Sequence, residues 1–219
     1  MIFFVQGATY PGPLLTASML VIVLAFAYHE FAHAIVADWL GDPTPRAHGR
    51  ISLNPFVHLD MVGLVLVAVT GFGYASTPVT PSMFKGNMRV SHALVAVAGP
   101  IANLLMALLF AIPLRFGLVP MEPPTSDMLP SLYMFLEIGV FFNLLLFAFN
   151  LLPVPPLDGF TILEGIVPPE LAYRLSGLRR YGLILLMLLV FVFPAMEVII
   201  PFIQIIMFII SGQFWPTYL

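Results

Sequence analysis

Three ionisable side chains lie within one turn of an apolar stretch: His29, Glu30 and His33, in the segment His-Glu-Phe-Ala-His. On an α-helix, residues i and i+4 lie about 40° apart around the axis, so both imidazoles can reach a single point. Glu30 lies about 60° from His33, close enough to hold a water at that point without binding a metal itself. This spacing is typical of metalloproteases, in which two histidines bind Zn²⁺ and the glutamate acts as general base.

A catalytic zinc generally takes three protein ligands and keeps one position open for water. The third ligand must be a histidine or a carboxylate, because the chain has no cysteine. The candidates outside the first motif are His48, His58, His92, Asp60, Asp158 and Glu164. Asp158 follows three prolines within residues 153–156, which interrupt the end of an apolar helix. Since broken backbone at membrane depth is tolerated only where protein or water lines it, we predict that Asp158 is the third ligand.

The helices that must position these side chains belong to a membrane protein. Of the 219 residues, 60% are hydrophobic and 9% are charged, whereas a soluble domain has about 25% charged residues. A net charge of −3 argues against a basic nucleic-acid-binding surface. We expect a single all-α polytopic membrane domain over residues 1–219, with a catalytic core at about 13–165 and C-terminal helices at about 178–214.

Apolar runs predict where the chain crosses the bilayer, which takes about 20 helical residues. Transmembrane helices are expected at 14–40, 90–116 and 132–151, and the run 181–215 is divided into two near Pro194 and Glu197. The run 61–70 is too short to cross. Glycines and prolines in 71–81 indicate extended chain with turns. We therefore expect about five transmembrane helices plus a re-entrant segment.

The distribution of cations favours the re-entrant segment. If 61–70 turns back, seven of the eight cations share one side of the membrane: Arg46, Arg50, Lys85, Arg89, Arg174, Arg179 and Arg180. The opposite loop, 118–130, holds Glu122 and Asp127 and no cation. The positive-inside rule assigns the cationic side to the cytoplasm. We expect a multi-pass protein of the cell membrane whose active site opens toward the cytoplasm.

Two motifs together resemble the site-2 protease family of intramembrane zinc metalloproteases: His-Glu-Phe-Ala-His at 29–33 and Asn-Leu-Leu-Pro-Val-Pro-Pro-Leu-Asp-Gly at 150–159. Further segments, at 41–44, 49–55, 58–60, 72–79 and 98–103, are similar to the compact branch of that family, which lacks PDZ and CBS domains. The similarity covers about residues 26–159.

The resemblance implies a chemistry and a substrate class. One zinc ion per chain would be bound by His29, His33 and Asp158, and Glu30 would activate the attacking water. The implied reaction is hydrolysis of a peptide bond in transmembrane segments of other membrane proteins, near the cytoplasmic face, as in regulated intramembrane proteolysis. The implied partners are such substrates and the lipid bilayer, with no nucleic acid.

The resemblance also implies how the substrate is held. Residues 71–81 match a membrane-embedded β-hairpin that receives the substrate as an added strand, which would satisfy the backbone groups of an unwound helix. The expected substrate-binding residues are Asn103, Asn150, Gly73, Tyr74 and Val79.

Some positions depart from the family's pattern. Ser76 and Thr80 stand where lysine and asparagine are frequent, and Phe160-Thr161 stands where Gly-Arg is common. The family's substrate preference is therefore not carried over to this chain.

Two other functions use the same residues. A metal- or proton-coupled transporter could hold its ion with His29, Glu30, His33 and Asp158, but the sequence has no second broken helix of an inverted repeat. A catalytically idle scaffold is disfavoured because every chemical group that the reaction requires is present. His58 and Asp60, which flank the re-entrant segment, have no assigned role.

Overall fold

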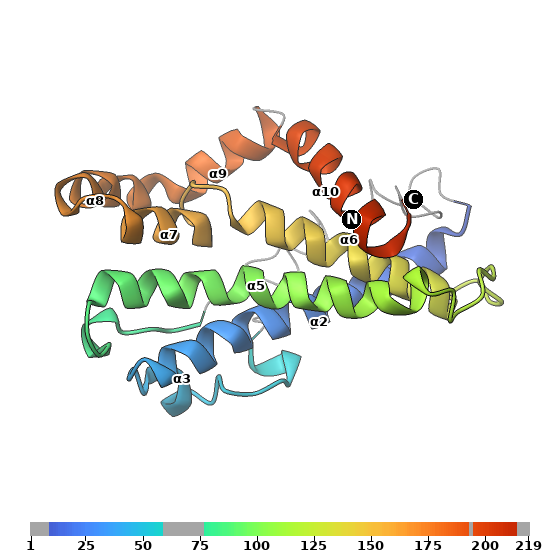
Figure 1. Cartoon of the computed structure of the whole chain (residues 1–219), viewed down its shortest axis with the longest axis horizontal. Coiled ribbons are helices and arrows are strands. Elements are labelled where there is room, and N and C mark those ends of the chain that lie inside the picture. The colour runs from blue at the N-terminus through green and yellow to red at the C-terminus, as the bar shows by residue number, and fades with distance from the viewer. Residues whose placement is uncertain (1–8, 59–76, 193–194, 214–219) are drawn as a thin grey trace.

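The computed structural model describes residues 9–58, 77–192 and 195–213, and within these the chain forms helices and turns without a β-strand. Three long helices, α2 (Pro11–Trp39), α5 (Met88–Arg115) and α6 (Leu132–Asn150), run along the long axis of the molecule and pack against one another (Figure 1). Each is long and apolar enough to cross a membrane. The chain is an all-α membrane protein, as its composition predicts.

The ends of the long helices follow from local signals that the sequence carries. The side chain of Asn87 accepts hydrogen bonds from the first amides of α5, and Ser131 does the same for α6, which is the usual role of an N-cap residue. Helix α2 ends before Gly41, whose φ of 102° is open to glycine but strained for other residues. The predicted boundaries of these three helices differ from the observed ones by at most three residues.

Short elements connect and follow the long helices. They are α3 (Thr44–Ala47), the 3₁₀ turns η1 (Pro55–Val57), η2 (Pro81–Met83) and η3 (Gly177–Tyr181), and the helices α7 (Asp158–Ile166) and α8 (Pro169–Ser176). Arg46 of α3 donates hydrogen bonds of 2.8 and 2.7 Å to Asp38 near the end of α2. These bonds raise the pKa of Arg46 above its ordinary value. The sequence did not predict α7 or α8.

The C-terminal apolar run is divided into α9 (Gly182–Phe191) and α10 (Ala195–Ser211), as Pro194 indicated. Helix α10 packs against α6 and α5. Among the described residues, three helices meet the length and hydropathy required for a span, and α10 is a shorter apolar helix. The expected number of five spans is therefore not confirmed among the described residues.

Two expected features lie largely outside the described residues. The re-entrant run 61–70 is wholly outside, and of the expected hairpin only residues 77–81 are described. Residues 77–80 have neither helix nor strand assignment.

The cationic segments gather at one end of the bundle. Helix α3, the first turn of α5 and helix α8 lie at this end (Figure 1). They carry Arg46, Arg89 and Arg174, while the far end of α5 carries Arg115.

Candidate metal centre

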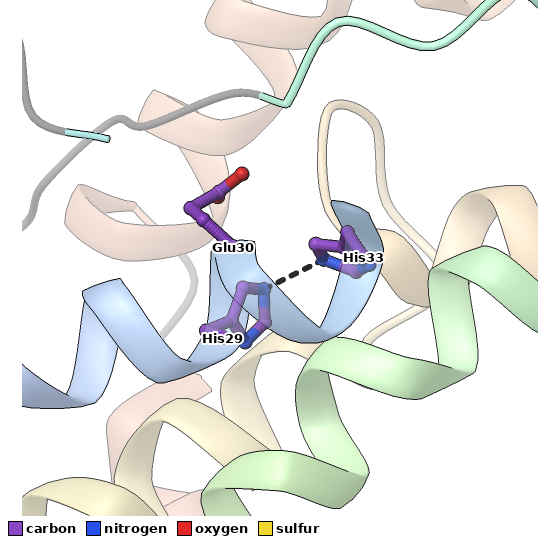
Figure 2. Close-up of side chains that lie close together, drawn as sticks. All are labelled: His29, Glu30 and His33. Carbon is purple, nitrogen blue, oxygen red and sulfur yellow. Dashed lines mark hydrogen bonds between the residues drawn. The ribbon is translucent and has the colours of Figure 1, made fainter. Parts of the chain in front are cut away.

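The two histidines of α2 face each other in the middle of the fold. His29 and His33 are buried, with 5% and 7% of their surfaces exposed, and their Nε2 atoms lie 3.0 Å apart (dashed line in Figure 2). Glu30 extends from the same turn of α2, and the ligand-type atoms of the three residues lie within 4.8 Å of one another. The helical period therefore produces the cluster that the spacing predicts.

Asp158 reaches the same point from the other end of the chain. Its Oδ2 atom lies 3.1 Å from Nε2 of His29 and 3.3 Å from Nε2 of His33. Of the five candidates for a third ligand that lie in the described residues, Asp158 is the one that the structure brings to both histidines. The neighbouring ligand-type atoms of a tetrahedral zinc site, with bonds of 2.0–2.2 Å, are about 3.3–3.5 Å apart, close to this triangle.

The hydrogen bond that Nδ1 of each ring makes determines whether Nε2 carries a proton or a lone pair. Nδ1 of His29 donates to the side-chain oxygen of Asn103 at 2.6 Å, and Nδ1 of His33 donates to the carbonyl oxygen of Val95 at 2.7 Å. Both acceptors are oxygens without a proton, so in each neutral ring the proton lies on Nδ1 and the lone pair on Nε2. Two lone pairs and one carboxylate oxygen thus converge on one point.

This convergence fits a metal cation. Oδ2 of Asp158 is buried and finds no hydrogen-bond partner among the described residues, and an unpaired buried carboxylate oxygen is costly in a protein interior. Three acceptors cannot stabilise one another, whereas a cation between them stabilises all three. Nitrogen and oxygen donors of this kind suit Zn²⁺.

Gly99 of α5 lets both imidazoles pack directly against the backbone of that helix. A Cβ atom at this position would lie 2.4 Å from Nε2 of His33 and 2.6 Å from Nε2 of His29. These distances are only slightly longer than a zinc–nitrogen bond of about 2.0–2.1 Å. The same Cβ would lie 2.6 Å from Cε1 of His29, so a side chain at residue 99 would collide with both imidazoles and displace them from the point on which the ligands converge.

Helix α7 positions Asp158 through contacts at both of its ends. Gly159 lets the helix begin against the preceding loop, because a Cβ there would lie 2.3 Å from the carbonyl oxygen of Leu151. At the other end, Arg89 of α5 donates to the carbonyl oxygens of Glu164, at 2.6 Å, and Val167. A cation at a helix C-terminus satisfies carbonyls that lack an intrahelical partner. Helix α5 thus holds α7 in the register that brings Asp158 to α2.

A threonine that the sequence did not single out holds Glu30. The hydroxyl of Thr77 donates to Oε2 of Glu30 at 2.7 Å and approaches the backbone oxygen of the same residue at 3.1 Å. This contact holds the carboxylate beside the two histidines, with its ligand-type atom within 4.8 Å of theirs.

The expected substrate-binding residues lie in different places. Asn103 is fully buried and bonded to His29, Asn150 donates to the backbone oxygen of Leu146 in its own helix, and Val79 packs against a small apolar cluster around Phe84. Gly73 and Tyr74 lie outside the described residues.

The other candidate ligands make separate contacts. His48 bonds to the backbone of Thr44, His58 to that of Ser52, and Glu164 to Arg179. His92 packs beside Phe84, and Asp60 lies outside the described residues.

Four contributors to the site were not assigned from the sequence: Gly99, Thr77, Arg89, and Asn143 of α6, whose side-chain oxygen accepts a hydrogen bond from Asn103. The Gly-Pro-x-x-Asn pattern at 99–103 was a visible signal for Gly99. The other three act through contacts between distant segments, and no local pattern marks them.

Comparisons with known proteins give a consistent group of relatives. The chain is 40% identical over 190 residues to "Putative zinc metalloprotease YwhC" of Bacillus subtilis, an alignment that covers 84% of each protein. It is 30% identical over 188 residues to the protein of Mycobacterium tuberculosis named Rip2, covering 81% of this chain and 69% of the relative. It is 27% identical over 173 residues to MJ0611 of Methanocaldococcus jannaschii, covering 78% and 80%. These two bear the same zinc-metalloprotease description. No protein-family model and no solved structure matches the chain.

Proposed function

The chain belongs to the site-2 protease family of zinc metalloproteases, and from this membership we propose that it cleaves peptide bonds within transmembrane segments of other membrane proteins. Zinc is its cofactor and proteolysis its general activity, as the names of its relatives and the His29–Glu30–His33 group indicate. The transport of an ion through the same cluster is not favoured by these relatives.

The observation that carries the proposal is the position of His29 and His33, with Asp158 beside them, within a helix long enough to span a membrane. His33 and His29 lie six and ten residues before the end of α2 at Trp39, which corresponds to about 9 and 15 Å along the axis. A charged or polar cluster at this depth is costly in a membrane unless it has a function. Because the cluster lies well within α2, a substrate bond must enter the membrane domain to reach it.

Each residue has a distinct role in the proposed reaction. His29, His33 and Asp158 would hold a single zinc ion, which when bound supplies Lewis acidity to the scissile carbonyl and acidifies the attacking water. Glu30 takes the proton of that water and returns it to the leaving amine. Thr77 keeps the Glu30 carboxylate oriented toward the reacting centre.

The substrate must unwind before its peptide bond can be attacked. We propose that it lies as an extended strand beside residues 71–81. The contact of Thr77 with Glu30 supports this, since Thr77 is the first described residue of that segment. Gly73, Tyr74 and Val79 would then present the backbone, with Asn150 near the loop that leads to Asp158. A re-entrant segment at 61–70 with a small hairpin, and five spans in all, complete the proposed architecture.

The proposed orientation places the site toward the cytoplasm. The cationic segments α3, α8 and the start of α5 lie at one end of the bundle (Figure 1), which is the end of α2 nearest to His33. The positive-inside rule assigns such an end to the cytoplasmic side.

The test compares the full chain with Glu30→Gln in proteoliposomes that contain a tagged model transmembrane segment. Wild type is expected to cleave the segment, and a zinc chelator to stop cleavage. Glu30→Gln should retain zinc and lose activity by about 10²–10⁴-fold, because the general base is removed while the ligands remain. Glu170→Gln, an exposed site on α8, is the matched control and should cleave as wild type does.

Two results would contradict the proposal. A Glu30→Gln chain of full activity would exclude the assigned mechanism. Uptake of metal into the vesicles without cleavage of any transmembrane segment would favour a transporter.

A further inference from the structure

Two asparagines lie in the interior where α2, α5 and α6 meet. Asn103 of α5 is 0% exposed and Asn143 of α6 is 1% exposed. A buried amide in a membrane helix is usually explained by hydrogen bonding between helices. Here Asn103 also bonds to His29, and Asn143 bonds to Asn103, so the pair is connected to the metal centre.

The hydrogen bonds of the two asparagines form a chain in which each group has a fixed role as donor or acceptor. The side-chain nitrogen of Asn103 donates to the backbone oxygen of Ala25 at 3.2 Å and to the side-chain oxygen of Asn143 at 3.1 Å. The side-chain nitrogen of Asn143 donates to the backbone oxygen of Gly139 at 2.9 Å. The side-chain oxygen of Asn103 accepts a hydrogen bond from Nδ1 of His29 at 2.6 Å.

Two backbone carbonyls determine this direction. A carbonyl oxygen can only accept, so the groups that face Ala25 and Gly139 must be the NH₂ ends of Asn103 and Asn143. The oxygen of Asn143 then faces Asn103, and the oxygen of Asn103 faces His29. Neither amide can rotate by 180° without placing two acceptors, or two donors, against each other in a buried site.

The orientation of Asn103 decides which nitrogen of His29 is available. If the NH₂ group of Asn103 faced Nδ1, that nitrogen would have to accept, and the proton of the neutral ring would move to Nε2. Nε2 is the atom that lies 3.1 Å from Asp158. A proton there would block the binding of a metal by His29.

We propose that Asn103 and Asn143 are positioning residues that fix the tautomer of His29. Backbone carbonyls of α2 and α6 orient the two amides, and the oxygen of Asn103 then keeps the proton of His29 on Nδ1, so that the Nε2 lone pair can bind zinc. The inference rests on the proposed function, because it concerns the same metal site. It gives Asn103 a role different from the substrate contact that the family resemblance implied. Loss of such an outer partner typically weakens metal binding by about 10–100-fold.

The experiment measures the zinc affinity of the full chain in detergent by competition with a chelator. Asn103→Leu removes the acceptor for His29 and should weaken zinc binding by about 10–100-fold. Asn103→Asp keeps an oxygen acceptor for His29 and puts its second carboxyl oxygen where the NH₂ group faces Ala25. With the proton on that second oxygen, which then donates as the NH₂ group does, the variant should recover part of that loss. Asn143→Leu leaves the Ala25 contact in place and should cause a smaller loss. Ser91→Ala, which removes another buried polar group of α5, is the matched control and should leave the affinity unchanged.

A double-mutant cycle separates positioning from a merely structural role. If Asn143 acts on the metal through Asn103, then Asn143→Leu should add no further loss in the Asn103→Leu background, because the amide that it orients is gone. If the two residues only stabilised the fold, the fold-losses of zinc affinity in the two single variants would instead multiply in the double variant. Helical circular dichroism of each variant identifies chains that have not folded, and Asn103→Asp with Asn143→Leu still test the inference if Asn103→Leu does not fold.

The outcomes distinguish this inference from the proposed function. Equal zinc affinity of wild type and Asn103→Leu, or multiplying losses in the double variant, would overturn the inference alone. A wild-type chain that binds zinc with the expected order of variants but cleaves no transmembrane segment would contradict the proposed function and leave the inference standing.

Discussion

Replacing Gly99 by alanine gives a direct test of where the metal binds. The added methyl group would lie 2.4 Å from Nε2 of His33 and 2.6 Å from Nε2 of His29, whereas non-bonded heavy atoms prefer about 3.5–4.0 Å. The imidazoles must therefore retreat by about 1 Å. Since a zinc–nitrogen bond is only about 2.0–2.1 Å long, a retreat of this size breaks both bonds.

The magnitude follows from this geometry. We expect Gly99→Ala to weaken zinc binding by more than about 100-fold, which corresponds to about 2.7 kcal/mol at 1.36 kcal/mol for each tenfold change. The cost to the metal-free fold should be smaller, about 1–3 kcal/mol for an overpacked interior, so the variant should still fold.

The assay is zinc content and chelator competition on the purified full chain, with helical circular dichroism as the check on folding. Gly12→Ala is the control for strain: its Cβ would lie 2.0 Å from the backbone oxygen of Asp127 at the other end of α2. That variant should lose stability but retain zinc. A folded Gly99→Ala chain that holds zinc as tightly as wild type would refute the placement of the metal between the two histidines.

Three further substitutions test other residues of the site and of the helix that carries Asp158. Asp158→Asn keeps the size of the side chain but removes the anionic ligand, so zinc content should fall below half and cleavage should be lost; an unchanged zinc content would exclude Asp158 as a ligand. Thr77→Val removes the hydrogen bond to Glu30 and should lower the cleavage rate by about tenfold, which corresponds to about 1.4 kcal/mol, at unchanged zinc affinity; equal loss of zinc would point to a structural role. Arg89→Met removes the cap of α7 and should lower the unfolding free energy by about 1–3 kcal/mol while weakening zinc binding, both measured on the same preparation; unchanged zinc binding would show that α7 keeps its register without Arg89.

The local part of the site was predictable because it depends on the helical period alone. His29, Glu30 and His33 lie within five residues, and any α-helix there brings both imidazoles to one side. The long helices were predictable for a similar reason: apolar runs that exceed the thickness of a bilayer leave few alternatives to a span. Helix α10 also follows the predicted break near Pro194.

The short helices were harder to predict. Helices α7 and α8 have nine and eight residues, and helices of that length owe their stability to packing rather than to intrinsic propensity. Asp158 was selected from six candidates because prolines break the chain before it, but nothing local indicates that α7 begins at that residue. Its position depends on Arg89 and Gly165, which pack α7 against α5.

The sequence by itself determined the membrane environment, the three longest helices, and two histidines with a glutamate on one helical turn, because composition and short-range periodicity carry that information. Only the tertiary structure decided which of the candidate residues meets the two histidines as a third ligand and that Gly99 lies against both imidazoles. It also decided that Asn103 and Asn143 determine which nitrogen of His29 carries the proton. The physical reason is the separation along the chain: Asn103 lies 74 residues from His29, and Asn143 lies 40 residues from Asn103. Contacts over such separations arise from the packing of α2, α5 and α6, which no local pattern encodes.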